Sequence, residues 1–153
     1  MRAPDIKSSC IALAVAAATM SPARAETPLE RGTYLMRSIV ACGNCHTPKG
    51  PQGELPGMEL AGNFKIQDDA FTAVVPNITP DPETGIGKWS EEEIAEYLGS
   101  GNKPDGDVAG GLMAEVIEGT LAGYKDLTQA DRLAIARYLK TVPPVRNKVE
   151  IKK

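Results

Sequence analysis

Apolar residues recur at helical spacing in three stretches of the 153-residue chain, and this pattern predicts three amphipathic helices. The first is expected from about Pro28 to Ala41, the second from Ser90 to about Gly99, and the third from Thr128 to Val142. The buried stripes are expected to be Leu35, Ser38, Ile39 and Cys42, then Ile94, Tyr97 and Leu98, then Ile135, Tyr138, Leu139 and Val142.

The second and third predicted helices carry clear signals at their ends. Ser90, with Glu93 three residues later, forms a capping box, and acidic side chains stabilise a helix N-terminus. Pro143 and Pro144 cannot continue a helix, so the third helix is expected to end before them. The charged tail after Val145 is expected to fray.

Glycine and proline are dense between His46 and Trp89, and such a sequence cannot form one continuous helix or strand. The residues from Phe71 to Val75 are the one plausible short strand. The pattern therefore predicts helices joined by long irregular loops. Loops of this length are unusual in a small domain unless they pack against a bound group instead of against other parts of the chain.

The clearest chemistry lies in five consecutive residues, Cys42-Gly43-Asn44-Cys45-His46. In this C-x-x-C-H pattern, two thiols each add to one vinyl group of a haem and the histidine binds the iron. His46 is the only histidine in the sequence, so a second histidine of this chain cannot bind the same iron. We therefore predict one covalently attached haem c, with its iron, held by Cys42, Cys45 and His46.

The alternatives to haem attachment fit the motif less well. A thioredoxin-like redox dithiol is expected within a βαβ pattern, and none is visible here. A structural zinc site needs four cysteine or histidine ligands, and only three are close together. A chance match is the third possibility, and the export signal described next argues against it.

Residues 1–25 have the pattern of a secretory signal peptide. Basic residues precede a short apolar core from Ser8 to Met20, and Ala23-Arg24-Ala25 fits a cleavage site. The apolar core is shorter than the roughly 20 residues that span a bilayer, and no later stretch approaches that length. We expect one domain over residues 26–153, exported to the periplasm and without a membrane span.

Removal of the signal peptide would change the cysteine count and the charge. Cys10 would leave with it, so the two cysteines of the motif would remain and no disulfide would be available. The formal net charge would fall from −3 to −5, because residues 1–25 hold three basic side chains and one acidic side chain. An acidic protein is a poor ligand for nucleic acid and suits a partner with a basic docking face.

A methionine is expected to supply the second axial ligand of the iron, and His/Met ligation raises the reduction potential. Met113 is favoured, because the chain between it and His46 is long enough to reach the opposite face of a haem. Met58 follows the motif too closely, and Met36 suits core packing on the first helix. The indole N–H of Trp89 suits a haem propionate, with simple core packing as the alternative.

Several runs of residues together resemble a known family. They are Arg31–Leu35, Cys42–Pro48, Asn77–Ser90, Gly111–Met113 and Ile135–Lys140. The chain resembles a class I-type mono-haem cytochrome c, and in particular the cytochrome c modules of bacterial periplasmic dehydrogenases of the alcohol, gluconate and nicotinate types. The C-x-x-C-H motif is shared by all c-type cytochromes, whereas Asn77–Ser90 is much more specific.

The resemblance implies a small all-α cytochrome c fold, with helices and long loops around one haem. It also implies that the N- and C-terminal helices cross near the haem and that Met113 is the distal ligand. Related subunits usually carry several such modules and a membrane-binding segment, whereas this sequence shows one module and no anchor.

Two functions are consistent with these features. The first is a non-enzymatic electron carrier, which takes single electrons from a periplasmic dehydrogenase and passes them to a cytochrome or oxidase of the respiratory chain. The alternative is a haem enzyme or gas sensor with an open sixth position, which requires that neither Met113 nor Met58 binds the iron. The sequence offers no distal histidine or acid/base group for peroxide chemistry, and this favours the carrier.

Overall fold

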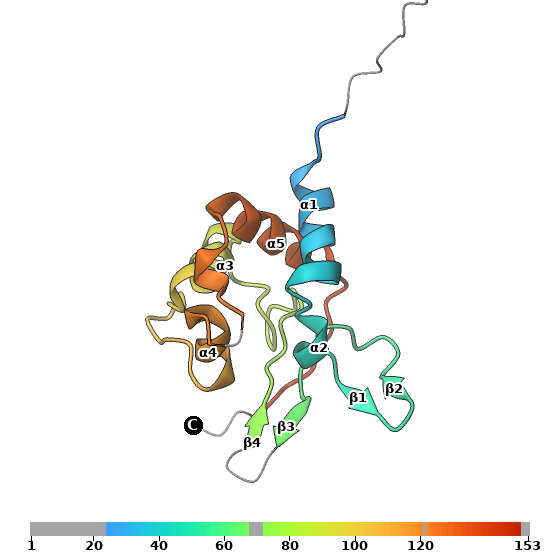
Figure 1. Ribbon diagram of the computed structural model, residues 1–153. Helices are drawn as coiled ribbons and strands as arrows, with labels where there is room; N and C mark the ends of the chain where they lie inside the picture. The colour runs from blue at the N-terminus through green and yellow to red at the C-terminus, as the bar shows by residue number, and fades with distance from the viewer. Residues whose placement is uncertain (1–23, 68–71, 121, 151–153) are drawn as a thin grey trace, which may run out of the picture.

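In a computed structural model, five helices lie around a common core and two small β-hairpins extend from its lower end (Figure 1). The structure describes residues 24–67, 72–120 and 122–150, so nearly all of the predicted signal peptide lies outside the described residues. The elements in chain order are α1 (Pro28–Tyr34), a π-helical turn (Leu35–Ile39), α2 (Gly43–His46), β1 (Lys49–Gly50), β2 (Gly53–Glu54), β3 (Lys65–Gln67), β4 (Thr72–Val74), α3 (Glu91–Ser100), α4 (Leu112–Glu118), a 3-10 turn (Tyr124–Asp126) and α5 (Gln129–Thr141).

The two hairpins correct the expectation of an all-α chain, which is right only in part. Strand β1 pairs antiparallel with β2, and β3 pairs antiparallel with β4, with Lys65 opposite Val74. Strand β4 corresponds to the predicted strand over 71–75, of which residue 71 lies outside the described part. The other three strands are two or three residues long, too short to show an alternating pattern in the sequence.

Helices α1 and α5 cross with their backbones in contact. A Cβ atom added at Gly32 would lie 2.0 Å from the carbonyl oxygen of Ala134 and 3.2 Å from Cβ of Tyr138. Beside this crossing, Arg31 Nε donates to Asp131 Oδ1 at 2.7 Å, and this hydrogen bond lowers the pKa of the Asp131 carboxyl. The predicted contact between the first and last helices is therefore confirmed.

The first helix differs from the prediction, because it changes to a π-helical turn after Tyr34. The Val40 N–H donates to the carbonyl of Leu35, five residues earlier, at 2.9 Å. This wider turn buries Leu35, Met36 and Val40, while Ile39 is 58% exposed. The predicted stripe containing Ile39 is therefore wrong, because a π-turn shifts the buried face by one residue.

Helices α3 and α5 follow the sequence closely. Ser90 and Glu93 form the predicted capping box, and α3 ends at Gly101 in the left-handed conformation. Thr128 caps α5 through a hydrogen bond from Asp131 N, and α5 ends before Pro143. The buried residues Ile94, Leu98, Ile135, Tyr138, Leu139 and Val142 form one cluster with Leu35, Met36, Val40, Leu60, Tyr124 and Ala136.

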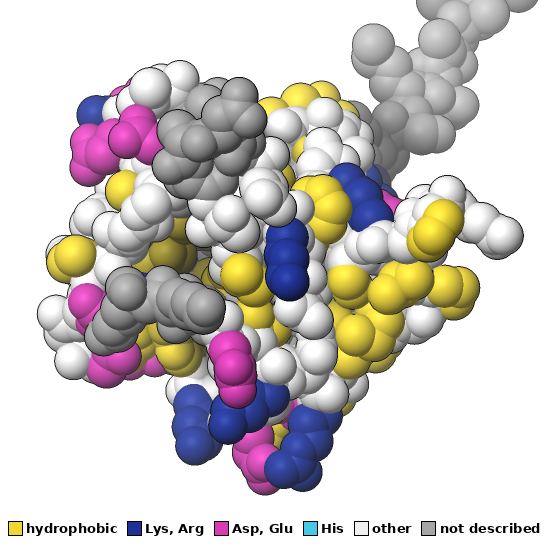
Figure 2. Space-filling view, turned by 90° about the horizontal axis from the view of Figure 1, so that it is seen from below, with side chains coloured by type: hydrophobic (Ala, Val, Ile, Leu, Met, Phe, Trp, Pro, Cys, Tyr) yellow, Lys and Arg dark blue, Asp and Glu magenta, His cyan; other side chains and the backbone are white. Residues whose placement is uncertain are grey.

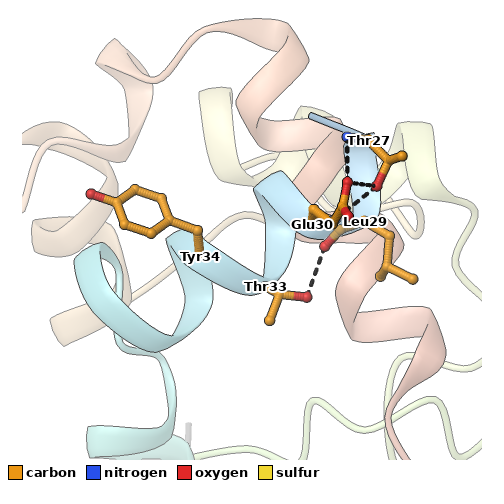
Figure 3. Close-up of a pocket in the computed structure, with 5 residues that line it drawn as sticks. All are labelled: Thr27, Leu29, Glu30, Thr33 and Tyr34. Carbon is orange, nitrogen blue, oxygen red and sulfur yellow. Dashed lines mark hydrogen bonds between the residues drawn. The ribbon is translucent and has the colours of Figure 1, made fainter. Parts of the chain in front are cut away.

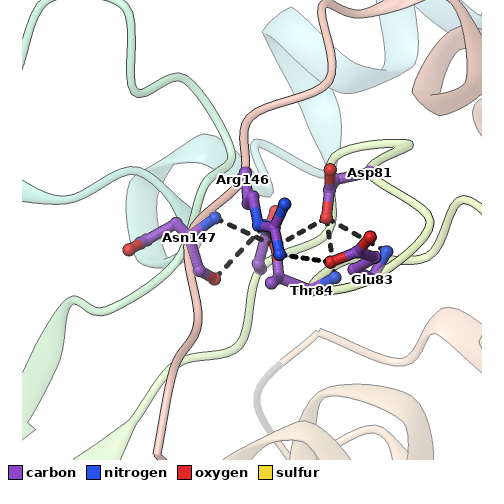
Figure 4. A network of polar contacts seen from close by, with 6 residues as sticks. Asp81, Glu83, Thr84, Arg146 and Asn147 are labelled. Carbon is purple, nitrogen blue, oxygen red and sulfur yellow. Dashed lines mark hydrogen bonds and ion pairs between the residues drawn. The ribbon is translucent and has the colours of Figure 1, made fainter.

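The C-terminal segment, here residues 143–147, is bound to the loop that follows β4 (Figure 4). Val145 O accepts a hydrogen bond from Asn77 Nδ2 at 2.8 Å, and Asn147 Nδ2 donates to Ala61 O at 2.9 Å. Arg146 forms an ion pair with Glu83. The prediction that the tail frays beyond Val145 is therefore wrong as far as residue 147.

Candidate functional site

The C-x-x-C-H motif forms a single tight helical turn. The backbone N–H groups of Cys45 and His46 both donate to the carbonyl of Cys42, at 3.2 and 2.8 Å. Residues three apart lie on the same side of a helix, so this turn places Cys42 and Cys45 on one side of it. Ala41, at φ 43°, turns the chain from the π-helical turn into this motif.

The two cysteines are both free but differ in their surroundings. Cys42 is half-buried against the hydrophobic core, and burial raises the pKa of its thiol to about 11. Cys45 is exposed. Next to Cys42, the buried Tyr124 hydroxyl donates to the carbonyl of Val40 at 2.6 Å and anchors the turn before the motif. The environment of Cys42 favours an uncharged sulfur, as in a thioether.

The imidazole of His46 is oriented by one main-chain hydrogen bond. Its Nδ1 lies 2.9 Å from the carbonyl oxygen of Pro76, which can only accept, so we assign the proton to Nδ1. Burial lowers the pKa of this half-buried imidazole, while the bond to Pro76 acts in the opposite direction. The neutral ring therefore has a lone pair on Nε2 that is available to a metal ion.

Met113 lies on α4, a helix that the sequence analysis did not predict. Gly111 and Gly119, at φ 56° and 109°, are the residues that cap its two ends. A glycine just after a run of helix-forming residues is a sequence signal for a helix end. Met113 is half-buried and packs against the hydrophobic core. In Figure 1, α4 and α2 lie on opposite sides of the lower half of the fold.

The other methionines are placed differently. Met36 is buried in the core, so the prediction that it is a packing residue is confirmed. Met58 is half-buried in the loop after β2.

Trp89 lies two residues before α3 in the sequence. Its ring makes an edge-to-face contact with Tyr97, with the ring centroids 5.5 Å apart and the planes at 74°. Its backbone carbonyl and that of Gly87 both accept from Lys140 Nζ at 2.8 Å. Trp89 is half-buried and packs against the core. Core packing was the alternative to a contact with a haem propionate. The indole N–H of Trp89 makes no hydrogen bond to another described residue.

A set of apolar side chains packs against the core on one side and stays partly exposed on the other. The set consists of Cys42, Ile78, Ile86, Trp89, Met113, Val116 and Leu127. Figure 2 shows that apolar side chains also gather on the face seen from below, where some of them are recessed. Half-buried apolar residues on both the motif side and the α4 side fit a large flat apolar group such as a haem.

A shallow depression at the start of α1 does not belong to this site. It is lined by Thr27, Leu29, Glu30, Thr33 and Tyr34 (Figure 3). Thr27 and Glu30 satisfy each other in a capping box, and the Thr33 hydroxyl donates to the Leu29 carbonyl. Tyr34 is 49% exposed, and the Arg31 guanidinium carbon lies 5.7 Å from the centre of its ring.

Two kinds of feature are absent from the described residues. No group of three or more His, Cys, Asp or Glu side chains there could hold a metal ion. In the same part of the chain, no helix is long and apolar enough to cross a membrane.

The functional residue that sequence reasoning missed is Pro76. It acts through its main-chain carbonyl and lies 30 residues from His46, so no local motif indicates it. It directly precedes the specific Asn77–Ser90 run, which is the only sequence signal that could have drawn attention to it.

No family model matches the chain, whereas individual proteins do. It is 43% identical over 117 residues to a diheme cytochrome c-type protein of Cereibacter sphaeroides, which covers 76% of this chain and 36% of the relative. It is 38% identical over 116 residues to the fructose dehydrogenase cytochrome subunit of Gluconobacter japonicus, a match that covers 74% of this chain and 22% of the relative. The gluconate 2-dehydrogenase cytochrome c subunit of Pantoea cypripedii is 33% identical over 147 residues, a match that covers 92% of this chain and 30% of the relative.

The chain thus spans about a third or less of the length of these relatives, while most of the chain itself is matched. These relatives are a diheme cytochrome c-type protein and the cytochrome subunits of alcohol, fructose and gluconate dehydrogenases. Most of this chain is therefore similar in sequence to parts of cytochrome c proteins, and the helical turn that carries Cys42, Cys45 and His46 agrees with that similarity.

Proposed function

We propose that this chain carries single electrons through one covalently bound haem c, with a dehydrogenase as donor and a respiratory cytochrome or oxidase as acceptor. The observation that carries the proposal is the hydrogen bond from His46 Nδ1 to Pro76 O, directly after the C-x-x-C pair. It fixes the ring so that Nε2 can bind iron. The names of the relatives support a dehydrogenase as partner, and the predicted signal peptide supports the periplasm as the compartment.

Each residue of the site has a distinct part in this proposal. Cys42 and Cys45 would hold the macrocycle through thioether bonds, and His46 would bind the iron through Nε2. Met113, on α4, would supply a thioether sulfur as the second protein ligand of the iron. A bound haem contributes the one-electron chemistry of its iron.

The chain's other residues shield and anchor the group. Ile78, Ile86, Val116 and Leu127 are half-buried against the core and would keep water from a bound haem. The indole N–H of Trp89 makes no hydrogen bond to another described residue and would be available to donate to a propionate. An apolar shell made of such residues has a low dielectric constant. It favours the less charged, reduced state of the iron and so raises the reduction potential.

The absorption spectrum of the ferric holoprotein tests the ligands. We expect a low-spin spectrum with the weak far-red band of a sulfur–iron bond. Met113→Ala should abolish that band and give a high-spin or water-bound spectrum, because the distal sulfur is removed. Met58→Ala is the matched control, since Met58 is the other half-buried methionine of the described residues, and it should leave the band unchanged.

The same spectra decide between the proposals. If Met58→Ala removes the band, Met58 is the distal ligand in place of Met113. If the wild-type protein is high-spin and its reduced form binds carbon monoxide rapidly, the sixth position is open. The protein is then a haem enzyme or gas sensor, and the carrier proposal fails.

A further inference from the structure

We infer that Gly62 is a positioning residue for the proximal ligand, because it holds the Pro76 carbonyl against His46 Nδ1. This inference rests on the proposed function, in which His46 binds the iron. Gly62 contacts both partners of that hydrogen bond, although it lies 16 residues after His46 and 14 before Pro76.

The first contact is a hydrogen bond to the motif. The Gly62 N–H donates to the carbonyl of His46 at 2.7 Å. This bond attaches the backbone of the loop after β2 directly to the residue that presents the imidazole, so the two cannot move independently.

The second contact is a close approach to Pro76. A Cβ atom at residue 62 would lie 2.4 Å from the Pro76 carbonyl carbon and 2.6 Å from its oxygen. It would also lie 2.4 Å from the backbone nitrogen of Asn77. All three atoms belong to the main chain, which cannot rotate away as a side-chain end can. Only glycine at position 62 therefore allows the Pro76 carbonyl to lie within hydrogen-bond distance of His46 Nδ1.

The bend around Gly62 is held from both sides. Leu60 and Asn63 have φ of 61° and 65°, and Gly62 has 74°, so three of four successive residues are left-handed. Leu60 O accepts from Ile78 N at 3.0 Å, and Asn63 N donates to Val75 O at 2.7 Å. A leucine in this conformation is strained and persists only where its surroundings fix it.

Thr47 ties the same bend to the haem motif. Its buried hydroxyl accepts from the Leu60 N–H at 3.1 Å, one residue after His46. The bend is thus bonded to residues 46 and 47 on one side and to the chain around Pro76 on the other.

The chemical consequence concerns the electron density on His46. An imidazole that donates from Nδ1 to a carbonyl is a stronger electron donor at Nε2, and it stabilises oxidised iron more than reduced iron. Displacement of the Pro76 carbonyl weakens that donation. It therefore raises the reduction potential and exposes the Nδ1 proton to exchange.

The test compares two glycines with the same backbone angle. Gly57 also has φ 74°, but a Cβ atom there would meet no other atom within 4 Å. In the haem-loaded protein, Gly62→Ala should shift the reduction potential upward and accelerate exchange of the His46 Nδ1 proton, measured by voltammetry and NMR. Gly57→Ala carries the same backbone strain, and both readouts should match the wild type.

If the Gly62→Ala variant does not fold, Thr47→Val is the second test. Valine keeps the shape of threonine and removes only the hydrogen bond between the Thr47 hydroxyl and the Leu60 N–H. Thr47→Val should shift the potential in the same direction by a smaller amount. The inference is overturned if the low-spin wild-type protein and both variants share one potential and one exchange rate. A wild-type protein without a histidine-bound haem would instead overturn the proposed function itself.

Discussion

At the scale of single residues, Asn77 connects the loop after β4 to the C-terminal segment. Its side chain is buried, with 4% of the residue exposed. Oδ1 accepts from the backbone N–H and the hydroxyl of Thr79, at 2.9 and 2.8 Å. Nδ2 donates to Val145 O at 2.8 Å and to Thr84 Oγ1 at 3.0 Å. Because Asn77 directly follows Pro76, this amide also fixes the chain that reaches His46.

We expect Asn77→Ala to lower the free energy of unfolding by about 2–3 kcal/mol, because buried donors and acceptors lose their partners. Urea unfolding followed by circular dichroism measures this change. Asn102→Ala is the control, since Asn102 is exposed and its side chain makes no hydrogen bond to a described residue. It should change the free energy by less than about 0.5 kcal/mol. Equal effects of the two substitutions would show that the network around Asn77 does not stabilise the fold.

At the scale of elements, the crossing of α1 and α5 depends on the missing side chain of Gly32. Because the opposing atom is the main-chain carbonyl of Ala134, an added methyl group can fit only if the two helices move apart. The crossing therefore fixes the position of α1, and with it the start of the segment that leads to Cys42.

Gly32→Ala should lower the free energy of unfolding by about 1–3 kcal/mol, despite the higher helix propensity of alanine, because overpacking outweighs it. Thermal unfolding of the holoprotein is a suitable measurement. Gly110→Ala provides the comparison, since a Cβ atom at Gly110 would meet no other atom within 4 Å. A stabilising effect of Gly32→Ala would mean that the helices tolerate a wider separation.

The sequence predicted those elements whose signals are local. Helices α3 and α5 have caps and a regular apolar stripe, so their positions were correct within a residue or two. The π-helical turn was not predictable from a 3.6-residue period, and the short hairpins have no period at all. Helix α4 was missed because its seven residues stand between glycines that are typical of loops.

The same distinction applies to the candidate site. Cys42, Cys45 and His46 are adjacent in sequence, so their chemistry could be inferred directly. Pro76 and Gly62 act through main-chain atoms brought together by folding, and a main-chain atom leaves no mark on residue type. Met113 was singled out by chain length and resemblance, and its role remains a proposal.

At the scale of the whole molecule, several apolar residues that pack against the core are only partly buried. They come from the motif, the loop after β4 and α4, among other segments. Apolar surface exposed to water weakens a small fold, so the bound group that we propose would contribute to stability as well as to electron transfer.

We expect the Cys42→Ala/Cys45→Ala double variant to lose its haem on purification and to melt at a lower temperature and less cooperatively than the holoprotein. Circular dichroism on heating measures both. Cys10→Ala is the control, since Cys10 lies in the predicted signal peptide, and it should leave haem content and melting unchanged. A double variant that melts as the holoprotein does would mean that the chain completes its core alone.

The π-helical turn between Tyr34 and Val40 also limits how the length of this chain can vary. Each residue of an α-helix advances the chain by about 100°, and the turn holds one residue more than a regular helix would between the crossing at Gly32 and the thiol at Cys42. A deletion there would rotate the motif away from Pro76 even if every remaining side chain were kept. Relatives of this chain should therefore differ freely in length around 102–110 or within the β1–β2 hairpin, and insertions or deletions between residues 32 and 42 should be rare.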